Sequence, residues 1–229
     1  MELLTLGNPK TDKGRKLGYL TGVLHLAPAS LSGVDVCPWS SAGCRAACLN
    51  TAGRGGIIKK GDTSNAIQRA RLRRTELYLT DRTAFLKSLY KDIAALERKA
   101  ARESLRPTLR LNGTSDLSWQ SVIHAVPHIK CYDYTKSIDR AVRYAQGKYP
   151  PNYHITFSKA EDNADAVRTA MLVGVNVAVV FRDVLPTMWN GKAVISGDDS
   201  DLRFLDTADR IVGLTAKGKA KKDDSGFVV

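Results

Sequence analysis

The sequence predicts an α/β fold: a partial or distorted (β/α) barrel of about six βα units, with an open, mostly parallel sheet as the alternative. Three observations lead to this prediction. After residue 105, apolar β-branched stretches alternate with segments of helical periodicity, as in strands joined by crossover helices. Residues 176–181 are almost continuously apolar, as in a strand buried on both faces. The chain has 229 residues, whereas a closed eight-unit barrel typically takes about 250, so the expected barrel is incomplete.

The elements follow from local patterns. Phe85, Leu89, Ile93 and Leu96 recur at helical spacing and predict the core-facing stripe of a helix. The helix of 63–102 is expected to break near Thr80 and Asp81, either of which can cap a second segment. Further helices are expected at 118–126, from Ser137 onward and at 163–172, the last ending at Gly174. The predicted strands are residues 17–26, 107–111, 129–133, 153–157, 176–181 and 210–215.

The amino-acid composition excludes several classes of protein. At 43% hydrophobic residues the chain can bury a core, and four cysteines are too few for a disulfide scaffold. No apolar run approaches the ~20 residues of a membrane span, and the N-terminus lacks a secretory signal pattern. We expect a single domain over 1–229, with a cysteine loop at 35–56 and a basic helical segment at 59–106. The expected location is the cytoplasm, without a membrane partner, and the oligomeric state stays open.

The charge points to a polyanionic partner. Thirty-five Lys and Arg against 23 Asp and Glu leave a formal charge of +12, and phosphates favour such surfaces because bound counterions are released. Solvated helix faces are the alternative explanation for such runs. The candidate nucleic-acid-binding residues form two blocks, Arg69, Arg71, Arg73 and Arg74 in the first and Lys217, Lys219, Lys221 and Lys222 in the second.

Three cysteines form a candidate metal site. Cys37, Cys44 and Cys48 are spaced C-x6-C-x3-C directly after the first predicted strand. Thiolates select zinc or iron–sulfur clusters, and three within twelve residues can surround one ion or cluster. Structural zinc needs a fourth ligand, for which Cys131 and His25 are candidates, whereas a [4Fe–4S] cluster on three cysteines keeps one iron open. A Cys44–Cys48 disulfide is the lesser alternative because the expected compartment is reducing.

Polar residues gather where predicted strands end. Asp116 paired with Asp198, Asp199 or Asp201 is the candidate catalytic pair, one carboxylate attacking or stabilising charge and the other moving protons. The structural alternatives are equally weighted: Asp116 as a helix cap or turn residue, the 198–201 stretch as an exposed turn, and Arg203 paired with Asp201 or Asp206. The candidate substrate-binding residues are Asn112, Thr114, Asp133, Lys136 and Arg203.

The position of the cysteine loop resembles that of radical S-adenosylmethionine enzymes, which place three cysteines after the first strand of a partial barrel. That resemblance implies a [4Fe–4S] cluster and S-adenosylmethionine as cofactors, with the turn at 112–116 in place of their glycine-rich turn. Both gaps between the cysteines are longer here than the usual C-x3-C-x2-C.

Taken together, the motifs resemble a bacteriophage family, the gene product 88 family, over nearly the whole chain. They are CPWS at 37–40, RLNGTSD at 110–116, YDYTK at 132–136, GDD at 197–199, DLR at 201–203, GLTAKG at 213–218 and SGF at 225–227. The resemblance implies a phage-encoded protein acting in the host cytoplasm.

Three functions are therefore weighed. The first is DNA base modification by a metal-containing enzyme, similar to the tRNA-guanine transglycosylases, whose phage relatives exchange guanine in DNA for a 7-deazaguanine. The zinc cysteines of those enzymes lie late in the chain, whereas these lie early. The second is a radical S-adenosylmethionine-type enzyme, and the third is a non-catalytic nucleic-acid-binding protein with structural zinc.

Overall fold

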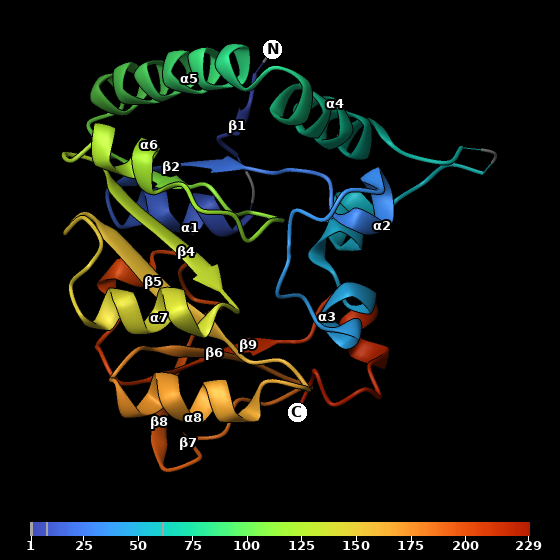
Figure 1. Cartoon of the computed structure of the whole chain (residues 1–229), viewed down its shortest axis with the longest axis vertical. Coiled ribbons are helices and arrows are strands. Elements are labelled where there is room, and N and C mark those ends of the chain that lie inside the picture. The colour runs from blue at the N-terminus through green and yellow to red at the C-terminus, as the bar shows by residue number, and fades with distance from the viewer. Residues whose placement is uncertain (1, 8, 61) are drawn as a thin grey trace.

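The computed structural model describes residues 2–7, 9–60 and 62–229, and its centre is one nine-stranded sheet (Figure 1). The strand order is β1-β2-β3-β4-β5-β6-β9-β8-β7. The strands are β1 (Leu4–Thr5), β2 (Tyr19–Leu24), β3 (Arg106–Arg110), β4 (Lys130–Thr135), β5 (Tyr153–Ser158), β6 (Val177–Phe181), β7 (Met188–Trp189), β8 (Lys192–Ser196) and β9 (Ile211–Thr215). Neighbours from β2 to β8 in this order pair in parallel, and the two edge strands β1 and β7 pair antiparallel.

The order of the parallel strands sets where the helices lie. From β2 to β6 each strand follows its predecessor without reversal, so right-handed crossovers place the connecting helices on one face. These are α5 (Arg82–Arg102), α6 (Gln120–Ala125), α7 (Ile138–Ala145) and α8 (Ala164–Leu172). No pairing among the described strands joins β1 to β7, so the sheet is open. The open, mostly parallel alternative therefore fits, and the partial or distorted barrel is not confirmed.

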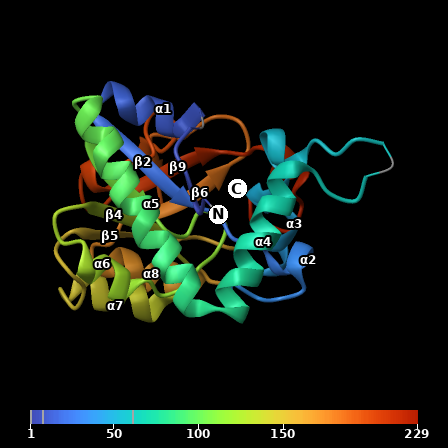
Figure 2. The same ribbon diagram turned by 90° about the horizontal axis from the view of Figure 1, so that it is seen from above.

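The long helical segment divides as its pattern predicts. α4 (Ala66–Thr80) ends at Asp81, whose side chain accepts the amide hydrogen of Ala84 and caps α5. The predicted stripe Phe85, Leu89, Ile93 and Leu96 is buried in the core. Figure 2 shows from above how α5 lies across the sheet. Ser137 caps α7 through the amide of Arg140, and Gly174 follows α8 with a φ of 77°.

Other boundaries differ from the prediction. α6 begins after Trp119 without a side-chain cap, so Ser118 does not cap it. The prediction missed β1, α1 (Pro9–Lys16) and the β7–β8 hairpin. The hairpin turns at Asn190 and Gly191, both with positive φ, which is the Asn-Gly signature of a two-residue turn. Its short, half-exposed strands lack the apolar run by which longer strands are found.

The face of the sheet opposite α5–α8 carries a smaller apolar cluster. Tyr19, Tyr132 and Leu202 are buried there beside Phe204, and α1 packs on it through Gly14, close to Leu202. Tyr132 points to this face because its neighbours Cys131 and Asp133 point to the other. None of the described helices is long and apolar enough to cross a membrane.

Candidate functional site

A cavity of about 260 Å³ lies at the carboxyl edge of the parallel strands. Figure 1 shows the segment with α2 (Ala29–Ser32) and α3 (Ala42–Ala46) on the side toward which β2 and β4 point. The cavity is lined by the cysteine loop, the end of β3 and the turn after it, residues of β4, β5, β6 and β9, the acidic loop after β8, and the C-terminal segment. The predicted site residues that line it are Cys37, Cys44, Cys48, Asn112, Thr114, Asp116, Lys136, Asp198, Asp201 and Lys217.

The three cysteines of the loop are half-buried free thiols. Burial raises the pKa of Cys37 to about 12, and the nearby Asp116, Cys48 and Cys44 add to this effect. Burial also raises the pKa of Cys48, whose sulfur accepts the amide hydrogen of Asn50 at 3.5 Å. No disulfide joins Cys44 to Cys48, so that alternative is wrong.

Glu161, which follows β5, anchors the start of α3, the helix that contains Cys44. Its carboxylate accepts hydrogen bonds from the Ser41 hydroxyl at 2.7 Å and the Gly43 amide at 2.6 Å. Burial is the largest single effect on the pKa of Glu161 and raises it, but the hydrogen bonds together outweigh burial and lower the pKa. Ser41 in turn caps α3 by accepting the Cys44 amide at 3.1 Å. A side chain at Gly43 would lie 2.9 Å from Glu161, so glycine permits this close approach.

Arg71 anchors the far end of the same loop. Its guanidinium is buried and donates to the carbonyl oxygen of Asn50 at 3.2 Å and to the Asn50 side-chain oxygen. Burial lowers the pKa of Arg71, which the charge of Cys48 partly counters. The expectation that Arg71 belongs to a nucleic-acid-binding surface is therefore wrong, because the guanidinium is enclosed and holds the cysteine loop to α4.

The fourth cysteine lies apart from the other three. Cys131 is buried on the helix-covered face, and its thiol donates to the Ile129 carbonyl at 3.5 Å. His25 is not among the residues that line the cavity, and burial lowers its pKa to about 3. Neither predicted fourth ligand therefore joins the three thiols. Among the described residues, no three His, Cys, Asp or Glu side chains are grouped closely enough to hold a single ion.

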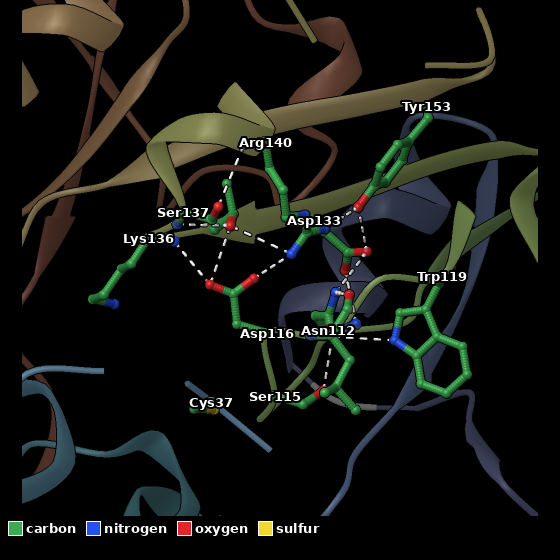
Figure 3. Close-up of polar contacts among 12 residues, drawn as sticks. Cys37, Asn112, Ser115, Asp116, Trp119, Asp133, Lys136, Ser137, Arg140 and Tyr153 are labelled. Carbon is green, nitrogen blue, oxygen red and sulfur yellow. Dashed lines mark hydrogen bonds and ion pairs between the residues drawn. The ribbon is translucent and has the colours of Figure 1, made fainter. Parts of the chain in front are cut away.

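Asn112 holds the turn after β3 in shape. Its side-chain oxygen accepts from the Ser115 hydroxyl at 2.8 Å, the Leu117 amide at 2.9 Å and the Trp119 indole at 3.1 Å (Figure 3). Its backbone amide donates at 2.7 Å to Asp133, a buried residue that is not among those lining the cavity. Burial raises the pKa of Asp133 to about 6. Asn112 and Asp133 thus shape the turn, and neither side chain is free for a ligand.

Asp116 lies at the end of this turn and is 7% exposed. Its carboxylate pairs with Arg140 and accepts the Lys136 amide at 2.8 Å and the Thr135 hydroxyl at 3.1 Å (Figure 3). Burial raises the pKa of Asp116, against the opposing charge of Arg140. The carboxylate lines the cavity but already has three partners, so its contacts fit a residue that positions β4 and α7 as well as one that reacts.

The acidic loop is divided among separate ion pairs. Asp201 pairs with Arg110 at 2.9 Å and accepts from the Tyr132 hydroxyl at 3.0 Å, whereas Asp198 pairs with Lys217 and accepts the Thr215 amide at 2.8 Å. Asp199 is exposed and is not among the cavity-lining residues.

Arg203, in the 3-10 helix η3 (Arg203–Leu205), is buried and pairs with Asp206 at 3.1 Å, one of the two partners expected. It is not among the residues lining the cavity, so the expectation that Arg203 contacts substrate there is wrong.

The remaining basic candidates lie on two surfaces. Arg69 and Arg73 are exposed on α4, whereas Arg74 is half-buried and donates to the Glu2 carbonyl at 3.1 Å. Lys219, Lys221 and Lys222 are exposed on the 3-10 helix η4 (Gly218–Lys222), which contacts η1 (Leu49–Thr51) of the cysteine loop. Two exposed arginines of that loop, Arg45 and Arg54, escaped the prediction because they are isolated in sequence.

Comparisons with known proteins identify the family alone. No curated protein and no solved structure matches the chain. A family model described as gene product 88 matches residues 2–229, as the motifs of the cysteine loop and the strand ends indicate. The chain therefore belongs to the gene product 88 family.

Proposed function

We propose that this chain is an iron–sulfur enzyme acting on nucleic acid, in which Cys37, Cys44 and Cys48 hold a [4Fe–4S] cluster with one iron facing the cavity. One observation carries the proposal: the loop after the first parallel strand presents three thiols to one cavity, and the fourth cysteine is buried elsewhere. Three protein ligands leave a coordination position for a ligand bound in the cavity.

The spacing of the side chains counts against a single zinc ion. Around one tetrahedral zinc with bonds near 2.3 Å, the sulfur atoms stand about 4 Å apart. The described residues contain no such compact group of three ligands. In a cluster each cysteine binds a different iron, so the thiolates stand farther apart. A [4Fe–4S] cluster held by Cys37, Cys44 and Cys48 would supply one-electron reduction of S-adenosylmethionine bound at its open iron, once the cluster is itself reduced by an external one-electron donor.

The chain's own residues would shape and enclose this chemistry. The turn held by Asn112 and the end of β4 form the floor of the cavity, and Phe227 of the C-terminal segment lines its wall. Glu161 and Arg71 fix the cysteine loop at its two ends.

Nucleic acid is the proposed substrate, with DNA favoured over RNA. Exposed Lys219, Lys221 and Lys222 on η4 and exposed Arg45 and Arg54 on the cysteine loop carry positive charge beside the cavity. Such residues neutralise phosphates, so affinity should fall steeply with salt concentration.

Guanine exchange for a 7-deazaguanine, as in the transglycosylases, is the second candidate. It is favoured by Asp116, Asp198 and Asp201, which line the same cavity as the cysteines. It ranks second because each carboxylate is already held in an ion pair, whereas attack on a sugar carbon needs an uncommitted carboxylate.

The test is anaerobic reconstitution of the full chain with iron and sulfide. We expect a brown protein with a visible absorption band, about four irons per chain, and an electron paramagnetic resonance spectrum that changes when S-adenosylmethionine is added. Cys37→Ala, Cys44→Ala and Cys48→Ala should each lose the cluster, whereas Cys131→Ala should keep it. A colourless protein containing one zinc would overturn the proposal and leave base exchange or a binding protein with structural zinc.

The nucleic-acid step is tested separately by titrating single- and double-stranded DNA at several salt concentrations. Replacing Lys219, Lys221 and Lys222 by Met should weaken binding and flatten the salt dependence. The control replaces Lys87, Lys91 and Lys148, which are exposed on α5 and after α7, and changes the charge equally. Equal losses of DNA affinity in the two variants would contradict the proposal that η4 belongs to the interface.

A further inference from the structure

We infer that Lys136 and Ser158, from the ends of two neighbouring strands, form a subsite in the cavity for an anionic oxygen group of the ligand, a phosphate or a carboxylate. The inference goes beyond the proposed cluster, because it concerns side chains that bind ligand whether or not the thiols hold iron.

The pairing of charges in the cavity singles out Lys136. The charged side chains lining it are Arg110, Asp116, Lys136, Asp198, Asp201 and Lys217. Arg110 pairs with Asp201, Lys217 with Asp198, and Asp116 with Arg140 from outside the lining. Among the described residues, the Lys136 ammonium has no hydrogen bond or ion pair, and it lies 5.7 Å from the centre of the Phe227 ring. Its charge acts at longer range on Asp116, Cys37 and Cys48, where burial raises the pKa values and the charge of Lys136 lowers them in part.

The side chain of Lys136 points away from the carboxylate of Asp116 (Figure 3). Its backbone amide donates to Asp116, but Figure 3 shows the side chain extending away from that carboxylate and from Arg140. Arg140 and Thr135 occupy the Asp116 oxygens. The ammonium is half-buried and offers three donors to the cavity, so an anionic ligand can satisfy it.

The sheet register supplies a second donor. Thr135 of β4 pairs with Phe157 of β5, so the next residues, Lys136 and Ser158, come side by side at the carboxyl edge. Both line the cavity, and the Ser158 hydroxyl has no hydrogen-bond partner among the described residues. An ammonium and a hydroxyl on adjacent strands can together bind two oxygens of one phosphate or carboxylate group.

The test uses matched pairs of probes on metal-free, reduced full-length protein. Adenosine 5′-monophosphate against adenosine tests a phosphate, and adenosine-5′-carboxylic acid against its neutral carboxamide tests a carboxylate. By calorimetric titration, we expect the anionic member of at least one pair to bind roughly 10- to 100-fold more tightly. The pair that shows this preference identifies the anionic group.

The variants assign the preference to the residues. Lys136→Met should bring the ratio within each pair close to one, and Ser158→Ala should reduce it a few-fold. Lys148→Met removes an equal charge from an exposed loop and should leave the ratio unchanged. Equal urea midpoints for the variants and the wild type establish that folding is intact.

Two results would overturn the inference. One is a wild-type protein that prefers neither anionic probe, and the other is a Lys136→Met variant that keeps the preference. If that variant also lost iron on reconstitution while keeping the preference, Lys136 would serve the cysteine thiolates instead. Because these titrations need no metal, a failed reconstitution of the cluster leaves their outcome unaffected.

Discussion

Replacing Arg71 by Met tests whether α4 holds the cysteine loop in place. Arg71 is 8% exposed and donates to both oxygens of Asn50, whose amide in turn donates to the sulfur of Cys48. Methionine preserves much of the packing volume while removing the charge and both hydrogen bonds. The residues most affected should be those of the loop from Cys44 to Gly56, because Arg71 is the buried cation that contacts it.

The size of the effect follows from these contacts. A hydrogen bond from a charged donor contributes about 1.5–3 kcal/mol, so two contribute at most about 6 kcal/mol. Burial of the Arg71 guanidinium is itself costly, because it lowers the pKa of the group and leaves Nε without a hydrogen-bond partner. The methionine variant no longer carries this cost. A net loss of about 2–3 kcal/mol for local opening of the loop is therefore expected, which is roughly a 30- to 140-fold change in the opening equilibrium.

Hydrogen exchange read by mass spectrometry measures this opening directly. Peptides covering 44–56 should exchange faster by that factor in Arg71→Met, while peptides from β4 and β5 should stay unchanged. The control is Arg73→Met, two residues along α4, where the side chain is exposed. If loop exchange in Arg71→Met matched that of the control, the argument that Arg71 positions the loop would be refuted.

Three further predictions concern the turn, its buried carboxylate and the second loop anchor. Gly113→Ala places a methyl group 2.7 Å from the Leu24 carbonyl and should lower the free energy of unfolding by about 1–3 kcal/mol or more in urea, whereas Gly7→Ala, with open space around it, should not. The pKa of Asp133 in the folded protein is raised to about 6, so its contribution to stability is present below pH 4 and lost as pH rises through 6. Asp133→Asn should remove this contribution from the slope of unfolding free energy against pH, measured by urea titration between pH 4 and 7. An unchanged slope would contradict the assignment. Glu161→Ala removes the partner of Ser41 and Gly43, so peptides covering 41–47 should exchange faster, and protection equal to the wild type would exclude Glu161 as an anchor.

Much of the fold follows from patterns along the chain. Long apolar strands such as β6 and the helical stripe of α5 are recognisable because burial requires a regular spacing of apolar residues. The β7–β8 hairpin is too short for that signal, and its turn residues Asn190 and Gly191 were the local signal that the prediction missed. Whether the sheet closes into a barrel could not be predicted from the sequence, because closure depends on strand twist and on which edges meet and not on any local pattern.

The residues of the site were easier to predict than their partners. Strand-end position brings Cys37, Asp116 and Lys136 to one cavity, because parallel strands share a carboxyl edge. Which groups then pair depends on register and helix placement. Arg71 and Arg73 are neighbours in a basic run, yet one is enclosed and the other exposed because α4 presents one side to the cysteine loop. Charge type alone did not separate them.

Asp116 shows why a single substitution does not define its role. Asp116→Asn leaves Arg140 as a buried cation without its counter-ion and is expected to cost about 3–5 kcal/mol, so activity would fall for structural reasons alone. The double variant Asp116→Asn with Arg140→Met removes both charges and should recover most of that stability in urea unfolding. If activity on nucleic acid recovers with stability, Asp116 is a positioning residue, as its three hydrogen-bonded partners indicate. A stable double variant that binds nucleic acid but stays inactive would instead make the carboxylate part of the reaction, and base exchange would become the leading proposal.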